Sequence, residues 1–180
     1  MISNQAKAGF DSLLAKSLRD GLSSDEVTEI EVVEHIPAID KQQAVVLTVS
    51  SYVFRLLVMI HFDAAGMVRS YMERKQGVTE MDDRLFLDAI AEFGNLSCGI
   101  LNRDLGNYFP HLGMSTPNYV EGRCVNYLEM LGYNHAQHFA VKINGEALFH
   151  ASLCVKAYEE IHFVVNEQEE RAETGELELF

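Results

Sequence analysis

One predicted helix, which starts near Thr79 or Asp82 and runs to about Asp104, carries the residues of this chain that are best suited to chemistry. Residues 82–104 contain a polar set at spacings of four and three, which places its members on one narrow stripe of a helix: Asp88, Glu92, Asn95, Gly99 and Asn102. Glu92 and Asn95 are neighbours on this stripe, with β-carbons about 5 to 6 Å apart. The pair combines a carboxylate, which accepts hydrogen bonds, with an amide, which both donates and accepts them.

The rest of the same helix is apolar, so most of its girth should be buried. The apolar positions are Leu85, Phe86, Leu87, Ala89, Ile90, Phe93, Leu96, Ile100 and Leu101. The polar stripe is then the solvent-exposed side of the helix, and it is either a functional surface or only a solvated face. Gly94 and Gly99 favour function, because glycine inside a helix costs about 1 kcal/mol relative to alanine and calls for a packing or access reason. We expect Gly99, one turn beyond Asn95, to let another surface approach closely.

The elements around this helix predict an α+β fold. An amphipathic helix is expected over residues 4–21, and a short helix over 64–75 that Gly77 terminates. Runs rich in valine, isoleucine and aromatic residues predict strands over residues 27–36, 42–54, 55–63, 136–144 and 146–158. Two or three of the first three strands are expected to be antiparallel neighbours. Asn144-Gly145 predicts a two-residue hairpin between the last two strands. Blocks in this order imply long helices packed on a largely antiparallel sheet.

Three segments are less sharply patterned. Residues 108–122 read as a proline-punctuated connection, with or without a short strand, residues 124–131 are ambiguous, and residues 161–165 could add a strand. The chain has 180 residues, which suits one domain, and we expect it to span residues 1–165. Residues 166–180 are rich in glutamate and predict an acidic tail, either solvated or forming a peripheral helix.

The amino-acid composition limits which partners, cellular locations and cysteine sites are expected for this chain. Twenty-seven acidic against fourteen basic residues give a formal net charge of -13, which repels nucleic acid and better suits a basic or metal-loaded protein partner. No long apolar run or signal-like amino terminus is present, so we expect a cytoplasmic protein without membrane insertion. The three cysteines, Cys98, Cys124 and Cys154, form no CxxC pair and are expected to be buried reduced thiols.

Other catalytic and metal-binding motifs are missing from the sequence. His135 and His138 form an H-x-x-H pair, but no second pair with suitable spacing accompanies it, so we expect no metal site. The chain has no G-x-S-x-G elbow, no P-loop and no dinucleotide fingerprint. We therefore expect no intrinsic cofactor.

Residues 85–106, LFLDAIAEFGNLSCGILNRDLG, resemble the active-site helix of the CheC/CheX family of response-regulator phosphatases. That family's signature is Asp or Ser, three residues, Glu, two residues and Asn, which here corresponds to Asp88, Glu92 and Asn95. The family also has a proline a little over twenty residues later, followed by a glycine, as Pro117 and Gly122 are here. The resemblance runs from the first helix to about residue 157 and favours the CheX branch, because a single E-x-x-N is present.

The resemblance implies a CheC-like fold, a homodimer built through sheet elements, and a phosphorylated CheY-like receiver domain as partner. In this family the helix docks on the receiver. Glu92 would pair with a receiver lysine and Asn95 would orient the water that hydrolyses the aspartyl phosphate, while Mg²⁺ would come with the receiver. Gly99 would permit close approach, and Asp88 would either contact the receiver or be a surface acid without a direct role.

Two further interpretations remain open at this point. A CheX-like domain can bind a receiver without hydrolysis, as an adaptor or scaffold, although the intact Glu92 and Asn95 favour the enzyme. The second interpretation is a structural role like that of the flagellar-switch relatives, which would be expected together with an attached switch domain.

Overall fold

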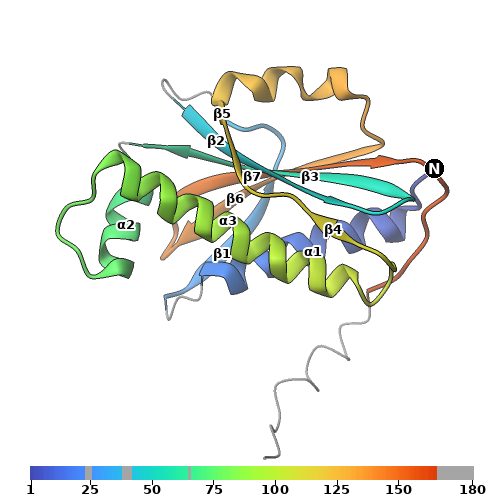
Figure 1. Cartoon of the computed structure of the whole chain (residues 1–180), viewed down its shortest axis with the longest axis horizontal. Coiled ribbons are helices and arrows are strands. Elements are labelled where there is room, and N and C mark those ends of the chain that lie inside the picture. The colour runs from blue at the N-terminus through green and yellow to red at the C-terminus, as the bar shows by residue number, and fades with distance from the viewer. Residues whose placement is uncertain (23–25, 38–41, 65, 166–180) are drawn as a thin grey trace, which may run out of the picture.

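The structure, a computed structural model, describes residues 1–22, 26–37, 42–64 and 66–165. A twisted antiparallel sheet runs through the middle of the molecule (Figure 1). Three helices cover one face of this sheet, namely α1 (Asn4–Leu22), α2 (Met67–Gln76) and α3 (Asp83–Leu105), and a 3₁₀ helix, η1 (Gly122–Leu131), lies over the other. The predicted α+β class is therefore confirmed, with long helices on the sheet.

Seven strands make up the sheet in the described part of the chain. They are β1 (Thr28–Val33), β2 (Gln42–Ser50), β3 (Phe54–Asp63), β4 (Gly113–Met114), β5 (Asn118–Glu121), β6 (His135–Ile143) and β7 (Glu146–Ala157). Their order is β1-β6-β7-β3-β2-β4, and β5 also pairs with β2. All these pairings are antiparallel.

Strand neighbours close in sequence follow the prediction of two or three antiparallel neighbours, of which two are formed, and β1 pairs with a strand far away in the sequence. Strands β2 and β3 are antiparallel neighbours, and β6 and β7 form the predicted hairpin. Asn144 and Gly145 both have positive φ, 51° and 81°, as the two-residue turn requires. The third candidate neighbour, β1, instead pairs with β6 at the sheet edge. Tertiary packing selects such a partner, so the local pattern of β1 does not specify it.

The less sharply patterned segments resolve in different ways. The connection over residues 108–122 holds the short strands β4 and β5, and the ambiguous residues 124–131 belong to η1. The suggested strand over residues 161–165 is not formed, since Ile161 makes only one isolated bridge, to Ile2. Phe163 instead packs its ring on Phe10, with ring centroids 4.9 Å apart. Aromatic packing rather than backbone pairing therefore holds this segment.

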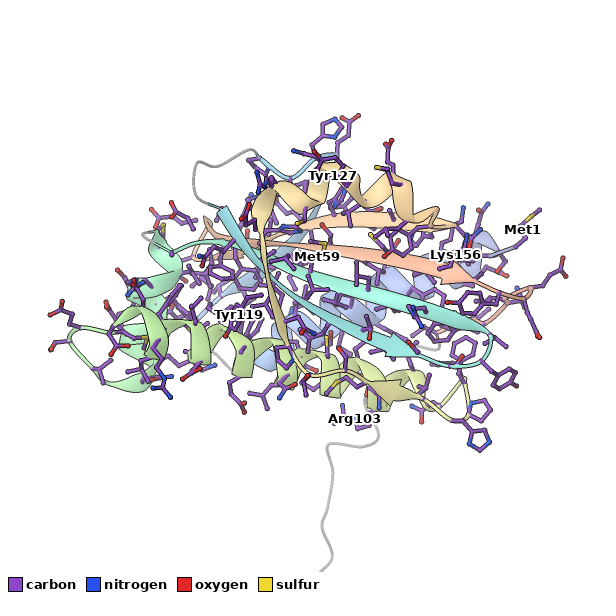
Figure 2. All side chains as sticks on the ribbon, turned by 45° about the horizontal axis from the view of Figure 1, so that its top comes forward. Met1, Met59, Arg103, Tyr119, Tyr127 and Lys156 are labelled. Atoms are coloured by element: carbon purple, nitrogen blue, oxygen red, sulfur yellow. The ribbon has the colours of Figure 1, made fainter. Side chains whose placement is uncertain are left out.

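The prediction for the cysteines is correct at two positions and wrong at one. Cys98 and Cys154 are buried free thiols, and burial raises the pKa of each to about 12. Cys124 is exposed, because η1 is amphipathic and turns only one side, including Leu128, toward the sheet. Figure 2 shows Met59 on the sheet face beneath this helix.

No helix among the described residues is long and apolar enough to cross a membrane. The acidic tail predicted over residues 166–180 lies outside the described residues.

Candidate functional site

Helix α3 has well-defined ends, and these set the register of every candidate residue on it. The side chain of Asp82 accepts a hydrogen bond of 2.8 Å from the backbone N–H of Leu85, which is the usual way to satisfy a free donor in the first turn. At the other end, the backbone N–H of Gly106 bonds to the carbonyls of Asn102 and Arg103. The helix therefore spans Asp83–Leu105, close to the predicted residues 82–104.

Gly94 places α3 very close to the sheet. A β-carbon added there would lie 3.0 Å from Leu47 Cδ1 and 3.3 Å from Ile60 Cδ1, both on the helix-covered face. A contact this short leaves little room for any side chain at position 94. The packing reason expected for this glycine is therefore present, and the opposite side of α3 must face outward.

The outward side carries the predicted polar stripe. Asp88 and Glu92 are exposed, and Asn95 and Gly99 are partly buried, so these four lie on one accessible face. Asn102, the last member of the stripe, is also partly buried, but its amide oxygen is enclosed in the protein. Neither Glu92 nor Asn95 makes a side-chain hydrogen bond or ion pair with another residue that the structure describes. Both groups are thus available to a partner.

The outward face is more apolar than predicted. Leu85 and Leu96 were both expected to be buried, but they are 41% and 49% exposed. A single sheet and a neighbouring helix can cover only part of the circumference of α3, so a helix with this many apolar residues must leave some of them in solvent. Exposed leucine beside Glu92 and Asn95 makes this face resemble a contact surface rather than a plain solvated one.

A shallow hollow of about 360 Å³ lies beside Asn95. It is lined by Glu92, Asn95, Leu96, Gly99, Ile100, Arg103 and, from β4, Met114. A β-carbon added at Gly99 would meet nothing within 4 Å, so this glycine faces open space. Gly94 and Gly99 therefore have different structural settings, since the first allows close packing on the sheet and the second keeps the hollow open.

Arg103 belongs to the same surface and was not among the site residues predicted from the sequence. It follows Asn95 and Gly99 at intervals of four residues, so the helical period that located the stripe also identifies it. Its Nε and Nη2 each lie 2.9 Å from Oδ1 of Asp104. Asp104 is only 7% exposed, and its Oδ2 lies 3.0 Å from Nζ of Lys16 on α1. Arg103 thus lines the hollow as a cation that is paired with Asp104, and its side chain remains 69% exposed.

Asp88 lies beside β5, near the other end of the stripe. Tyr119 on β5 donates a hydrogen bond of 2.6 Å from its hydroxyl to the carbonyl oxygen of Leu87. Burial raises the pKa of Tyr119, and the negative charge of Asp88 adds to that shift. The Tyr119 hydroxyl therefore ties β5, which follows Pro117 in the chain, to α3 near Asp88.

The H-x-x-H pair does not form a joint site. His135 Nε2 lies 2.7 Å from Oδ1 of Asp11 on α1, whereas His138 Nδ1 lies 2.8 Å from Oγ of Ser152 in the sheet. The two side chains thus have separate partners. Among the described residues, no group of three or more His, Cys, Asp or Glu side chains is arranged to hold a metal ion.

Comparison with known proteins gives matches in structure alone. No protein-family model matches the sequence, and no curated protein matches it. CheX from Vibrio vulnificus superposes with a TM-score of 0.59 at 16% identity, over 82% of this chain and 99% of that one. The present chain has the CheC-like fold. A structure of the CheX-CheY-BeF3-Mg²⁺ complex from Borrelia burgdorferi matches with a TM-score of 0.56 at 14% identity, over 82% of this chain and 95% of that one.

The CheC-like fold occurs in proteins of different kinds. The middle domain of FliM from H. pylori also matches, with a TM-score of 0.55 at 12% identity, over 84% of this chain and 92% of that one. Because one fold serves both CheX and a FliM domain, the function of this chain has to be argued from the residues on α3.

Proposed function

We propose that this chain is a CheX-like phosphatase that hydrolyses the aspartyl phosphate of a CheY-like response-regulator receiver, in chemotaxis or a related two-component pathway. The observation that carries the proposal is the pairing of Glu92 and Asn95 on an exposed face of α3, beside the hollow at Gly99. A domain that used this face only for solubility would have no need of an open glycine and exposed Leu96 next to the pair.

Asn95 is suited to orienting the attacking water. Hydrolysis of an acyl phosphate needs the water oxygen in line with phosphorus, after which the bond from phosphorus to the aspartyl oxygen breaks and the carboxylate leaves with inorganic phosphate as product. An amide can accept a hydrogen bond from that water and donate one to a phosphoryl oxygen, and it brings no negative charge. The receiver would supply the Mg²⁺ that neutralises the phosphoryl group.

Glu92 is suited to anchoring rather than to chemistry. An ionised carboxylate beside a phosphoryl group repels it, so Glu92 needs a cation of its own on the receiver, and a lysine provides one. Arg103 lies on the same face beyond Asn95, so charge along the face changes from acidic at Asp88 and Glu92 to basic at Arg103. This polarity would fix the direction in which a receiver lies on α3, with Leu96 and Met114 supplying apolar contact.

We also propose a cellular location, an oligomeric state and a source of Mg²⁺ for this protein, none of which follows from the fold alone. The protein acts in the cytoplasm, and it is a homodimer assembled through sheet elements. Strand β1 suits such assembly because it is an edge strand of the sheet among the described residues. Its Mg²⁺ requirement belongs to the receiver.

The test measures phosphate loss from a panel of the host's phosphorylated receivers, with the wild-type chain, with Asn95→Ala and with Asn107→Ala. Asn107 is exposed just beyond α3, outside the hollow, and serves as the matched control. We expect acceleration by the wild type and by Asn107→Ala, and a loss of about 10²-fold with Asn95→Ala, since misplacing an attacking group costs about this much.

A receiver-binding adaptor without catalysis is the second candidate, and the FliM match favours keeping it, because the fold also serves in that protein. Binding of a receiver to α3 without faster phosphate loss for any member of the panel would refute the phosphatase and support the adaptor. Equal acceleration by wild type and Asn95→Ala would refute the role of Asn95.

A further inference from the structure

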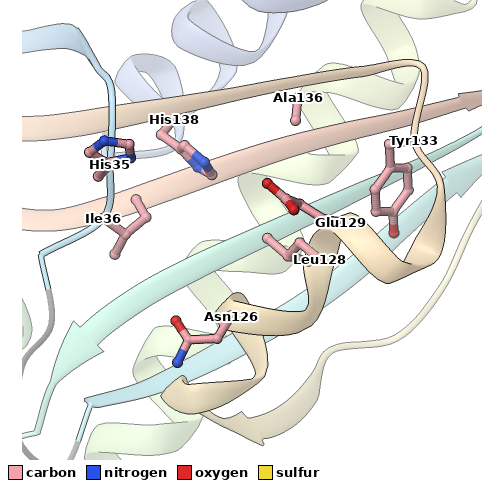
Figure 3. A pocket seen from close by; sticks show the side chains of 8 residues that line it. All are labelled: His35, Ile36, Asn126, Leu128, Glu129, Tyr133, Ala136 and His138. Carbon is pink, nitrogen blue, oxygen red and sulfur yellow. The ribbon is translucent and has the colours of Figure 1, made fainter.

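A second cavity lies between η1 and the strands (Figure 3). It is on the face of the sheet opposite to α3 (Figure 1). Its volume is about 490 Å³, within the usual range for sites that hold small molecules. It is lined by His35, Ile36, Asn126, Leu128, Glu129, Tyr133, Ala136 and His138. Nothing in the proposed phosphatase chemistry uses these residues.

The walls of this cavity are held in place by contacts outside it. Leu128 packs into a small apolar cluster with Ala44, Met59 and Cys154, which attaches η1 to the sheet. The end of η1 is fixed by Lys156, whose Nζ donates a hydrogen bond of 2.6 Å to the carbonyl oxygen of Gly132. These two contacts therefore hold η1 against the sheet, while the lining residues Asn126, Glu129 and Ala136 are exposed.

The floor of the cavity carries a hydrogen-bonded imidazole. His138 Nδ1 and His61 Nε2 each lie 2.8 Å from the hydroxyl oxygen of Ser152, and both His61 and Ser152 are fully buried. Because Nδ1 of His138 is engaged with Ser152, its Nε2 is the ring nitrogen left to interact with a molecule in the cavity. Burial lowers the pKa of His138, and the neighbouring His35 lowers it further, so the neutral form of this ring is favoured.

The wall contributes one formal charge, and it is negative. Glu129 projects from η1 toward the space above the sheet, as the ring of His138 does from below (Figure 3). Neither lysine nor arginine is among the described lining residues, and the chain as a whole carries a net charge of -13. An anion would therefore meet an unfavourable potential here, whereas a cation would be attracted. Ile36, Leu128 and Ala136 add apolar surface around this single charge.

We propose that this cavity is a binding site for a small organic amine with an apolar body, whose ammonium group pairs with Glu129. The neutral imidazole of His138 and the amide of Asn126 then offer hydrogen bonds to further polar groups of the ligand, and the apolar side chains contact its hydrocarbon part. The proposal does not depend on the phosphatase activity, because none of its residues lies on α3.

The experiment uses two probes that share a phenylethyl body and carry opposite charges, phenethylamine and 3-phenylpropionate. Each is titrated into the full chain at pH 7 by calorimetry and by amide NMR. We expect saturable binding of the amine, with shifts confined to η1 and the facing strands, and no saturable binding of the acid. Glu129→Gln, which keeps the size of the side chain, should weaken amine binding by about tenfold or more. Glu80→Gln, an exposed change on the helical side of the molecule, should leave it unaltered.

A second variant tests the cavity itself. Ala136 is exposed in the cavity lining, so Ala136→Leu should fill part of the space without disturbing the core and should also weaken amine binding. No saturable binding of the amine, equal binding of amine and acid, or unchanged affinity in Glu129→Gln would each overturn the proposal.

Discussion

Mild acid should destabilise the fold through His61. This residue on β3 is fully buried, its Nε2 lies 2.8 Å from Ser152 Oγ, and its Nδ1 has no hydrogen-bond partner among the described residues. The side chains of His138 and His150 are the other titratable groups that face it. Burial, with smaller contributions from these two imidazoles, lowers the pKa of His61 from 6.5 to about 4.

The size of the effect follows from this difference in pKa. Between pH 6.5 and about pH 4 the unfolded chain binds a proton at His61 that the folded chain does not, so the free energy of unfolding falls as the pH falls through this window. Integration from pH 7 to pH 5 gives a loss of about 2 kcal/mol, and the full difference corresponds to about 3 kcal/mol. The lowered pKa values of His138 and His150 act in the same direction.

Urea denaturation at pH 7 and pH 5 measures this loss directly. The wild type should lose about 2 kcal/mol more between the two conditions than His61→Gln, which has no titrating ring at that position. His162→Gln, at an exposed position, should behave as the wild type does. Equal losses in the wild type and His61→Gln would refute the reasoning, and so would an NMR titration of the His61 ring with a midpoint at or above 6.5.

Three further predictions concern α3. Gly94→Leu should lower the free energy of unfolding by about 1–3 kcal/mol, because the sheet is in contact at that position. Gly99→Ala faces open space and should raise the free energy of unfolding by up to about 1 kcal/mol. Urea denaturation of the two variants shows whether these opposite changes occur. Asp104→Asn should lower the free energy of unfolding by about 1–3 kcal/mol, measured in the same assay, because the Asp104 carboxylate is buried and paired with Lys16. Asp83→Asn, at an exposed ion pair, should lower it by less than about 1 kcal/mol, and equal losses for the two variants would argue against a buried ion pair at Asp104. Arg103→Glu should weaken binding of a beryllofluoride-loaded receiver by about tenfold or more, measured by calorimetry, and unchanged affinity would exclude Arg103 from the docking face.

The candidate site was predictable to the extent that it depends on one helix. Asp88, Glu92 and Asn95 share a face because the helical period is a local property, and the capping residue Asp82 marks where the helix begins. The hairpin at Asn144 was predictable for a similar reason, since two adjacent residues with positive φ define it. In each case the information lies within a few residues of the feature.

Other parts of the site depend on contacts between distant segments. The exposure of Leu96 could not be read from its apolar character, because it depends on how much of α3 the sheet covers. Met114 reaches the hollow only because β4 pairs with β2, and the cavity at Glu129 exists only because η1 lies over the sheet. Such distances in sequence leave no periodic signal.

By itself, the sequence determined the class of the fold, the extent of α3 and the stripe that carries Glu92 and Asn95, since all of these rest on periodicity, turn chemistry and spacing along the chain. The motif residues on that stripe also carried the resemblance to the CheC/CheX family. Only the tertiary structure decided that β1 joins β6, that Gly94 faces the sheet while Gly99 faces solvent, and that His61 is buried beside two other imidazoles. The physical reason is that burial and long-range pairing are properties of the packed molecule, in which each segment's surroundings come from residues far away in the sequence.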